Sequence, residues 1–365
     1  MKRIIALGLL LFSVSANAIN YTVTVLPSLS PTGPTRANGI NDNGMIVGES
    51  YNTTSGQLEA VYWDGGAITT LGVRGTARAV NNSGMMVGET GGLNAFDQGR
   101  AYSYDTSGLV YTDLGTLGGD YAAAFDINDA GVITGYALTS TNDLLRAHAF
   151  RYTAGTMTDL QAFNGLLSGY SRGHGINDSG VIAGRSSIDT FQNSEKHMTQ
   201  WSATDVLQMS TGPYDYSTAQ DVNNAGVIVG NGKDALGNQV GMIWDGVTTI
   251  QLGTLGGSTS YLNALNELGD MVGYSTDAGN VRRAIITTDN GGTITDLNSL
   301  VTDLNGFSVL SSAHDVNESG QIIGYGTLEN GEVAAFLLTP VPVPAAVWLF
   351  GSALGLLGWV RRRSS

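Results

Sequence analysis

The chain has 365 residues, contains no cysteine and carries a formal net charge of −14. Such an acidic protein is not drawn to phosphate backbones by its overall charge, so nucleic acid is excluded as an expected partner. The absence of cysteine excludes disulfide bonds and thiolate metal sites. Glycine is abundant, at 51 residues, and charged residues make up only 13%, against about 25% in an average domain. This composition predicts many short strands joined by tight turns.

Residues 1–18 have the organisation of a secretory signal peptide. Two basic residues precede an apolar stretch over residues 4–14, and Ala16 and Ala18 place small residues at both positions that determine cleavage. We expect cleavage after Ala18, so that the mature chain begins at Ile19. An uncleaved membrane anchor is the alternative, although the apolar stretch is short for one. The chain is therefore predicted to be exported.

One sequence unit recurs seven times between the two ends of the chain. Its frame is Asn, two residues, Gly, one residue, Ile or Met, one residue, and a second Gly. The frame asparagine and the turn glycine of units one to seven are Asn41 and Gly44, Asn81 and Gly84, Asn128 and Gly131, Asn177 and Gly180, Asn223 and Gly226, Asn266 and Gly269, and Asn317 and Gly320. Successive frames lie 40 to 51 residues apart, which is typical of a four-stranded propeller blade.

Each element of the frame has a physical reason. The asparagine opens a tight turn, because its side chain can bond the backbone two residues further on. The turn glycine can adopt a positive φ without strain and so closes a hairpin. The apolar residues that follow begin a buried strand, and the second glycine predicts a close approach of a neighbouring backbone.

Two further strands complete most units. An aromatic third strand is represented by residues 60–63, and a fourth strand by residues 111–114. Unit seven has no fourth strand of its own, but residues 21–26 precede the first frame as the fourth strands precede the later ones. We therefore predict an all-β fold over residues 19–340, a seven-bladed β-propeller of four-stranded blades closed by the N-terminal strand. An open β-solenoid is the alternative.

The units resemble the HAF extracellular repeat family, which is named for a tripeptide that stands here as His148-Ala149-Phe150. The resemblance runs from about Ala37 to Thr339 and includes the Asn-x-x-Gly frame in all seven units. It implies an extracellular location and a propeller-like fold. It supplies no catalytic residues.

Residues 341–365 combine a proline motif, an apolar run over residues 345–360 and a basic end. The motif and the basic end are Val341, Pro342, Val343, Pro344 and Ala345, and Arg361, Arg362 and Arg363. A helix over residues 345–360 would span about 24 Å, enough for a transmembrane segment with flanking help, and its arginines would stay cytoplasmic. A plain C-terminal anchor is one interpretation.

This C-terminal arrangement closely resembles the PEP-CTERM sorting signal in its VPxPA form. The resemblance implies that an exosortase-type membrane transpeptidase cuts at the proline motif and passes the protein outward. We therefore expect a mature chain that ends near Pro344. Removal of both end segments takes away five basic residues and no acid, so the net charge changes from −14 to −19. The protein is then anchored in the inner membrane only transiently, before it reaches the cell surface or the surroundings.

The sequence singles out no catalytic residue, cofactor site or metal site. The histidines, His148, His174, His197 and His314, are not at metal-ligand spacing and are expected at solvent or turn positions. Asp126, Asp221 and Asp315, each two residues before a frame asparagine, resemble the start of a calcium loop. Only three of the seven units have this acid and none has a downstream bidentate glutamate, so the turn interpretation is favoured.

The predicted function is that of a non-catalytic surface or extracellular-matrix protein. Binding is expected through the most divergent loops, residues 91–99, 137–145 and 186–196, because loops on rigid scaffolds commonly carry recognition. An extracellular polysaccharide or another surface protein is the expected partner. The aromatic residues stand mostly at a repeat position, which favours core packing over a sugar platform. The alternative is a secreted carbohydrate-active enzyme, a hydrolase or a lyase, with its site in the propeller channel.

Overall fold

The computed structural model describes residues 20–91, 99–140, 146–165, 169–187, 196–202, 205–209, 216–288 and 291–342. The predicted signal-peptide cleavage site at residues 16–19, the motif residues 343–345, the apolar run 345–360 and the arginines 361–363 lie outside these ranges. Much of each predicted binding loop, at residues 92–98, 141–145 and 188–195, also lies outside them. Within the described ranges, no helix is long and apolar enough to cross a membrane.

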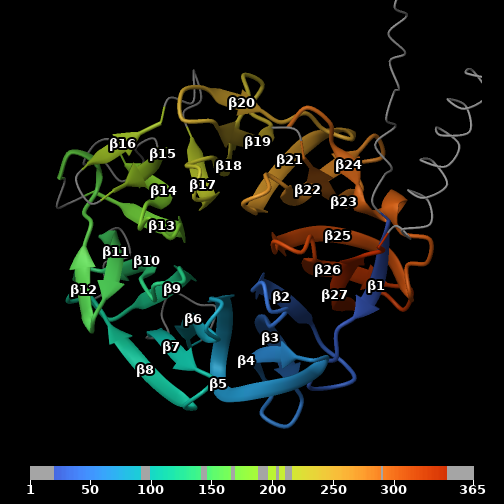
Figure 1. Cartoon of the computed structure of the whole chain (residues 1–365), viewed down its shortest axis with the longest axis horizontal. Helices are drawn as coiled ribbons and strands as arrows, with labels where there is room; N and C mark the ends of the chain where they lie inside the picture. The colour runs from blue at the N-terminus through green and yellow to red at the C-terminus, as the bar shows by residue number, and fades with distance from the viewer. Residues whose placement is uncertain are drawn as a thin grey trace, which may run out of the picture.

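The described chain forms small antiparallel sheets arranged around a central axis, a propeller-like all-β fold (Figure 1). Unit one contains β2 (Thr35–Ile40), β3 (Ile46–Asn52), β4 (Gln57–Asp64) and the first half of β5 (Ala67–Val80). Unit two contains the second half of β5, then β6 (Met85–Thr90), β7 (Ala101–Asp105) and β8 (Val110–Gly115). Because β5 pairs with both β4 and β6, these two units share one seven-stranded sheet.

Units three to six each form a four-stranded sheet. Their strands are β9 (Ala122–Ile127), β10 (Ile133–Leu138), β11 (Ala147–Thr153) and β12 (Thr156–Asp159); β13 (Ser171–Ile176), β14 (Ile182–Ser187), β15 (Lys196–Trp201) and β16 (Val206–Gln208); β17 (Ser217–Val222), β18 (Ile228–Lys233), β19 (Gln239–Trp244) and β20 (Thr249–Gln251); and β21 (Gly256–Leu265), β22 (Met271–Asp277), β23 (Arg282–Thr287) and β24 (Thr295–Asp296). Two short 3-10 helices, η1 (Phe163–Gly165) and η2 (Leu297–Leu300), follow the sheets' outer strands in units three and six.

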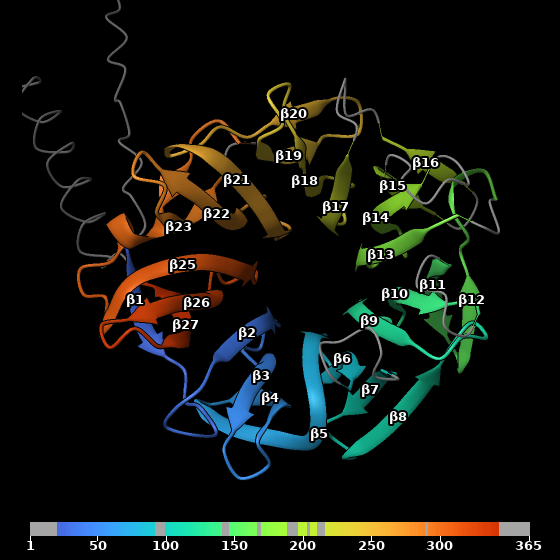
Figure 2. The same cartoon turned by 180° about the vertical axis from the view of Figure 1, so that it is seen from behind.

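The sheet of unit seven combines both ends of the described chain. It contains β25 (Phe307–Val316), β26 (Ile322–Leu328), β27 (Val333–Pro340) and β1 (Tyr21–Val25). β1 is antiparallel to β27, with Tyr21 opposite Pro340, and it lies at the outer edge of this sheet (Figure 2). The backbone N–H of Val341 also donates to Asn20 O at 2.8 Å, so the pairing extends to the start of the proline motif.

The core lies between neighbouring sheets. Trp63 of unit one packs with Ile323 and Ala335 of unit seven, and Trp201 of unit four packs with Ala149 of unit three. Both tryptophans are 1% exposed. The aromatic residues of the third strands thus fill the space between sheets, as the repeat position predicts, and burial of each such side chain contributes about 1.5–3 kcal/mol.

The turn glycines adopt the positive φ that the frame predicts. Their φ values lie between +71° and +85° in all seven units. The second glycine of each frame is in close contact with a neighbouring strand: a Cβ at Gly48 would lie 2.0 Å from Arg36 O, and one at Gly184 would lie 1.9 Å from Arg172 O. No side chain fits at that distance, which explains glycine at this position.

The frame asparagine does more than open its own turn. The predicted bond to the backbone two residues on is present in unit seven, where the N–H of Ser319 donates to Asn317 Oδ1 at 3.1 Å. In every unit, Oδ1 accepts the backbone N–H four residues on, as from Met45 to Asn41 Oδ1 at 2.9 Å. Its Nδ2 donates to the backbone carbonyl of the next unit's frame asparagine, as from Asn41 to Asn81 O at 2.9 Å. All seven asparagines make both contacts, and Asn317 donates to Asn41 O at 3.0 Å.

A second row of contacts runs parallel to the first at the surface. The residue after each frame asparagine donates its backbone N–H to the side-chain oxygen of its counterpart in the next unit, as from Asp42 to Asn82 at 2.9 Å. These residues are Asp42, Asn82, Asp129, Asp178, Asn224, Glu267 and Glu318. They surround a small opening of about 220 Å³ at one end of the axis, which we call the frame end.

Candidate functional site

The position three residues before each frame asparagine faces the central axis. The seven residues there are Asn38, Arg78, Phe125, His174, Gln220, Asn263 and His314, and together with Arg172 they line an axial cavity of about 350 Å³. Several bond the next inner strand: Asn38 Nδ2 donates to Ala77 O at 2.9 Å and Asn263 Nδ2 to Ala313 O at 2.6 Å. The axis is therefore lined mostly by polar side chains, and several of them also connect neighbouring units.

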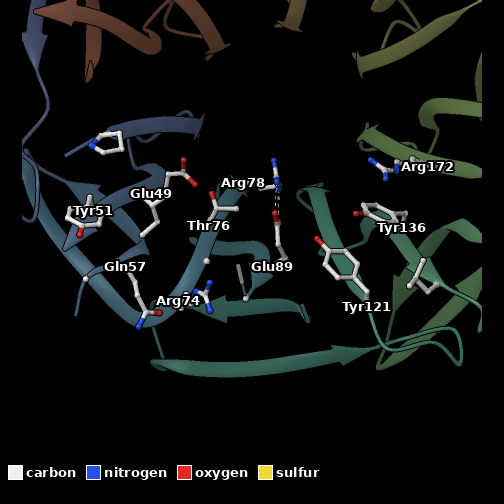
Figure 3. A pocket seen from close by; sticks show the side chains of 16 residues that line it. Glu49, Tyr51, Gln57, Arg74, Thr76, Arg78, Glu89, Tyr121, Tyr136 and Arg172 are labelled. Atoms are coloured by element: carbon white, nitrogen blue, oxygen red, sulfur yellow. Dashed lines mark hydrogen bonds and ion pairs between the residues drawn. The ribbon is translucent and has the colours of Figure 1, made fainter. Parts of the chain in front are cut away.

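A larger cavity, of about 670 Å³, opens at the end of the axis opposite the frame end; we call this the cavity end. Arg78 and Arg172 line both this cavity and the axial one, so the two cavities are adjacent. Its walls come from units one to four (Figure 3). The polar and aromatic lining residues are Glu49, Tyr51, Gln57, Arg74, Thr76, Arg78, Glu89, Tyr121, Tyr136 and Arg172.

Both carboxylates of this cavity are ion-paired. Arg36 Nη1 lies 2.7 Å from Glu49 Oε1, and Arg78 makes two contacts to Glu89, of which Nε to Oε2 measures 2.6 Å. Burial opposes the charge on Arg78, but the charge and the hydrogen bonds of Glu89 outweigh it and raise the pKa of Arg78 above its usual range. In the close-up, the Arg78–Glu89 pair lies between Glu49 and Tyr121 (Figure 3).

Aromatic rings and a further arginine form the opposite wall. Tyr121 stacks on Tyr136 with ring centroids 5.6 Å apart, and the guanidinium carbon of Arg172 lies 3.9 Å from the Tyr136 centroid. Burial, reinforced by Tyr136, raises the pKa of Tyr121 above its usual range, so its hydroxyl stays protonated. Figure 3 shows Arg172 beside Tyr136, across the cavity from Glu49 and Tyr51. The cavity thus combines half-buried tyrosine side chains with charged hydrogen-bonding groups.

All four histidines lie in strands, which corrects the expectation of solvent or turn positions. Burial, with Arg185 and Arg172 nearby, lowers the pKa of His174 to about 3, and burial lowers that of His314 to about 4, so both are neutral at ordinary pH. His148 is 1% exposed and its Nδ1 lies 2.9 Å from Asp159. Among the described residues, no group of three histidines or acids is placed to hold a metal ion.

The three aspartates that resemble calcium-loop ligands instead bind backbone. Asp315 accepts the N–H of Val316 at 2.8 Å and that of Ile40, in unit one, at 2.9 Å. Asp126 and Asp221 likewise each accept their own neighbour's N–H and one from the following unit. Their carboxyl groups therefore connect inner strands, a role that the repeat spacing did not reveal because it depends on which unit lies next in space.

Sequence reasoning also missed the residues of the cavity. Glu49, Glu89 and Tyr136 occupy one repeat position, directly after the second glycine, and Arg172 occupies another, five residues before the frame asparagine. These positions vary between units, so no motif marks them. Of the loops predicted to bind, only the described edges can be placed: Gly91 and Leu138 line the cavity.

Comparison with known proteins supports the fold and nothing finer. No family model matches the chain, and no curated protein matches it by sequence. The structure titled "YCF48 bound to D1 peptide" is similar, with 12% identity over 91% of this chain and 100% of that chain and a TM-score of 0.50. A puromycin-hydrolysing peptidase of Mycobacterium tuberculosis is similar with 10% identity and a TM-score of 0.53; the match covers 87% of this chain and 56% of the peptidase. At this identity, the resemblances indicate a propeller-like fold alone.

The buried aspartates predict how stability depends on pH. Burial raises the pKa of Asp221 to about 6 and of Asp315 to about 7, and it raises that of Asp126 well above its usual range. In the unfolded chain these acids lose their protons near pH 4, so above that pH the folded state binds more protons than the unfolded state. The free energy of unfolding should therefore fall as pH rises from 5 to 7, by on the order of 1 kcal/mol per pH unit for each titrating group.

Urea denaturation at half-unit steps from pH 5 to pH 8 measures this dependence. Asp315→Asn keeps an oxygen acceptor but does not titrate, so it should flatten the profile between pH 5 and 7 even if it lowers stability overall. A wild-type stability that rises with pH over this range, or an unchanged slope in the variant, would contradict the assignment.

Proposed function

We propose that the chain is an exported, non-catalytic surface protein that binds a saccharide in the 670 Å³ cavity at the cavity end. The observation that carries this proposal is the lining, in which the rings of Tyr51, Tyr121 and Tyr136 lie beside charged groups. Ring faces pack on the C–H surfaces of sugars, while arginine and carboxylate groups bond their hydroxyls. A concave, largely pre-formed cavity of this size is typical of a ligand site.

The arrangement of acids supports binding over the carbohydrate-active enzyme that the sequence leaves as the alternative. Hydrolysis of a glycosidic bond needs one carboxyl group that donates a proton and a second that acts as base or nucleophile. Glu49 and Glu89 are each engaged by an arginine. The axial histidines, His174 and His314, stay neutral because their pKa values are about 3 and 4. This set offers no free acid–base pair facing the cavity.

We further propose that the domain is a seven-bladed propeller closed by the N-terminal strand. The antiparallel pairing of β1 with β27 supports closure, since it joins residues from the two ends of the domain. The bond from Asn317 of unit seven to Asn41 of unit one supports it independently, because it continues the contact that links every other pair of neighbouring units.

Deletion of Ile19–Leu26 tests closure. Tyr21, Val23 and Leu26 are 4%, 8% and 4% exposed, and each buried side chain contributes roughly 1.5–3 kcal/mol, so the deletion should lower the melting temperature far more than eight surface residues would. Thr24→Ala, on the exposed face of the same strand, is the matched control and should melt like wild type. A deletion protein that melts at the wild-type temperature would rule out closure by this strand.

Export and sorting are part of the same proposal. The signal-peptide pattern at residues 1–18, the HAF-type repeats and the PEP-CTERM-type end at residues 341–365 all support a protein that an exosortase-type transpeptidase releases to the cell surface. Val341, at the start of the proline motif, is 42% exposed and directly follows β27. The motif therefore begins where the packed domain ends, which would leave it accessible to a processing enzyme.

Intact-mass analysis of the protein from the cell envelope tests the processing. The expected species begins at Ile19 and ends near Pro344, and cells without the sorting enzyme should instead retain Arg361–Arg363. A species that keeps these arginines in cells with an active sorting enzyme would overturn the sorting proposal, and an intact leader would overturn export.

Saccharide binding is tested on a glycan array, followed by calorimetry with the oligosaccharides that bind. Tyr136→Ala should weaken binding by about tenfold, since loss of one aromatic contact is worth about 0.5–1.5 kcal/mol. Tyr111→Ala removes an exposed ring outside the cavity and is the control. No binding to any glycan, or equal losses for both variants, would refute the site. Cleavage of a bound oligosaccharide during incubation would refute the non-catalytic assignment.

A further inference from the structure

Two arginines lie directly opposite each other at the cavity end. Arg172 on β13 is the cross-strand partner of Arg185 on β14. Like charges at such positions repel, so this pair costs stability unless something compensates it. Among the described residues, neither arginine is ion-paired with a carboxylate; Arg185 donates instead to the hydroxyls of Tyr216 and Tyr170.

The side chain of Arg172 has no hydrogen-bond acceptor among the described residues. Its Nε is buried without a partner. Its guanidinium carbon lies 3.9 Å from the centroid of Tyr136, a contact that uses none of the N–H donors along the guanidinium edge. Buried donors without a partner are rare in folded proteins and call for an explanation. The unused N–H donors of the Arg172 guanidinium edge belong to a residue that lines both the axial cavity and the adjacent cavity of about 670 Å³.

Further cations gather around the same end. The Lys196 ammonium lies 5.3 Å from the ring of Tyr170, and Arg282 lies 3.4 Å from the centroid of Tyr274 and donates to Ser312. Burial, followed by the charges of Arg185 and Arg172, lowers the pKa of Lys196. Lys196, Arg185 and Arg172 are therefore close enough to repel one another, although the whole chain carries a net charge of −14.

The acids of the cavity do not neutralise this charge. Glu49 and Glu89 are already matched by Arg36 and Arg78. At the opposite, frame end, five of the seven surface-row residues are aspartate or glutamate. The frame end is therefore acidic, whereas at the cavity end Arg172 and Arg185 have no carboxylate partner among the described residues.

We propose that the saccharide bound in the cavity carries a carboxylate, and that the free edge of Arg172 binds this carboxylate. The inference rests on the proposed saccharide binding and narrows it from sugars in general to acidic ones, such as polymers of uronate residues. A planar guanidinium fork matches a carboxylate with two parallel N–H···O bonds. A bound carboxylate would also relieve the repulsion between Arg172 and Arg185, which a neutral sugar would leave in place.

Calorimetry on the mature protein tests the inference with oligogalacturonate and oligomannuronate, each compared with its neutral methyl ester. At least one acidic oligosaccharide should bind about tenfold or more tightly than its ester, as expected for charge-assisted hydrogen bonds. Added salt should weaken the binding of the acidic oligosaccharide and not that of the ester. Arg172→Met keeps the length of the side chain and should lower the affinity for the acid by about tenfold or more, and the affinity for the ester much less. Lys233→Met, which removes one exposed positive charge from β18 outside the cavity, should change neither.

The outcomes separate this inference from the proposed function. Equal affinity for acid and ester, or equal losses for both in Arg172→Met, would overturn the role of the carboxylate and leave saccharide binding standing. Binding of polyglutamate with no binding of any saccharide would overturn both and identify an acidic peptide as the partner. Arg172→Gln serves as a second variant if Arg172→Met melts below wild type, and retention of wild-type affinity for the acid in a folded variant would equally overturn the role of Arg172.

Discussion

The frame asparagine is the residue on which the architecture depends. Its Oδ1 holds the hairpin of its own unit, and its Nδ2 holds the next unit through a backbone carbonyl. One buried side chain therefore fixes both the turn within a sheet and the position of the following sheet. Neither donor nor acceptor is left unsatisfied, which a buried amide requires. Replacement by aspartate would keep the acceptor but lose the donor, and serine is too short to reach both partners.

Three layers of polar contacts join neighbouring units along the axis. The surface row runs from Asp42 through its counterparts, and the asparagine row lies beneath it. Several of the residues three positions before the frame form the third layer, as where His314 Nδ1 donates to Ala37 O at 2.9 Å. The buried aspartates add bonds between selected units, as Asp315 does to Ile40. Because these bonds hold the inner strands, the outer strands and loops can differ between units without loss of the scaffold.

The sequence was sufficient to predict what every unit repeats. The positive φ of Gly131 and the close approach at Gly184 follow from the residue types alone, because only glycine avoids the strain or the clash. The pairing partner of β1 followed from counting strands per unit. The second contact of the asparagine and the role of Asp126 could not be predicted, because both bonds involve a residue some 40 to 50 positions away, whose placement depends on how the units are arranged in space.

The candidate site arises where the repeat is broken. Two repeat positions face each other across neighbouring strands at the cavity end: the position five residues before the frame asparagine and the position directly after the second glycine. In unit one they hold opposite charges, Arg36 and Glu49. In unit three they hold an apolar and an aromatic residue, Ala123 and Tyr136. In unit four the same two positions hold Arg172 and Arg185. A scaffold under selection for stability alone has no reason to place like charges opposite each other. Since the frame is intact in this unit, the frame does not require this repulsion, and the negatively charged ligand proposed above would relieve it.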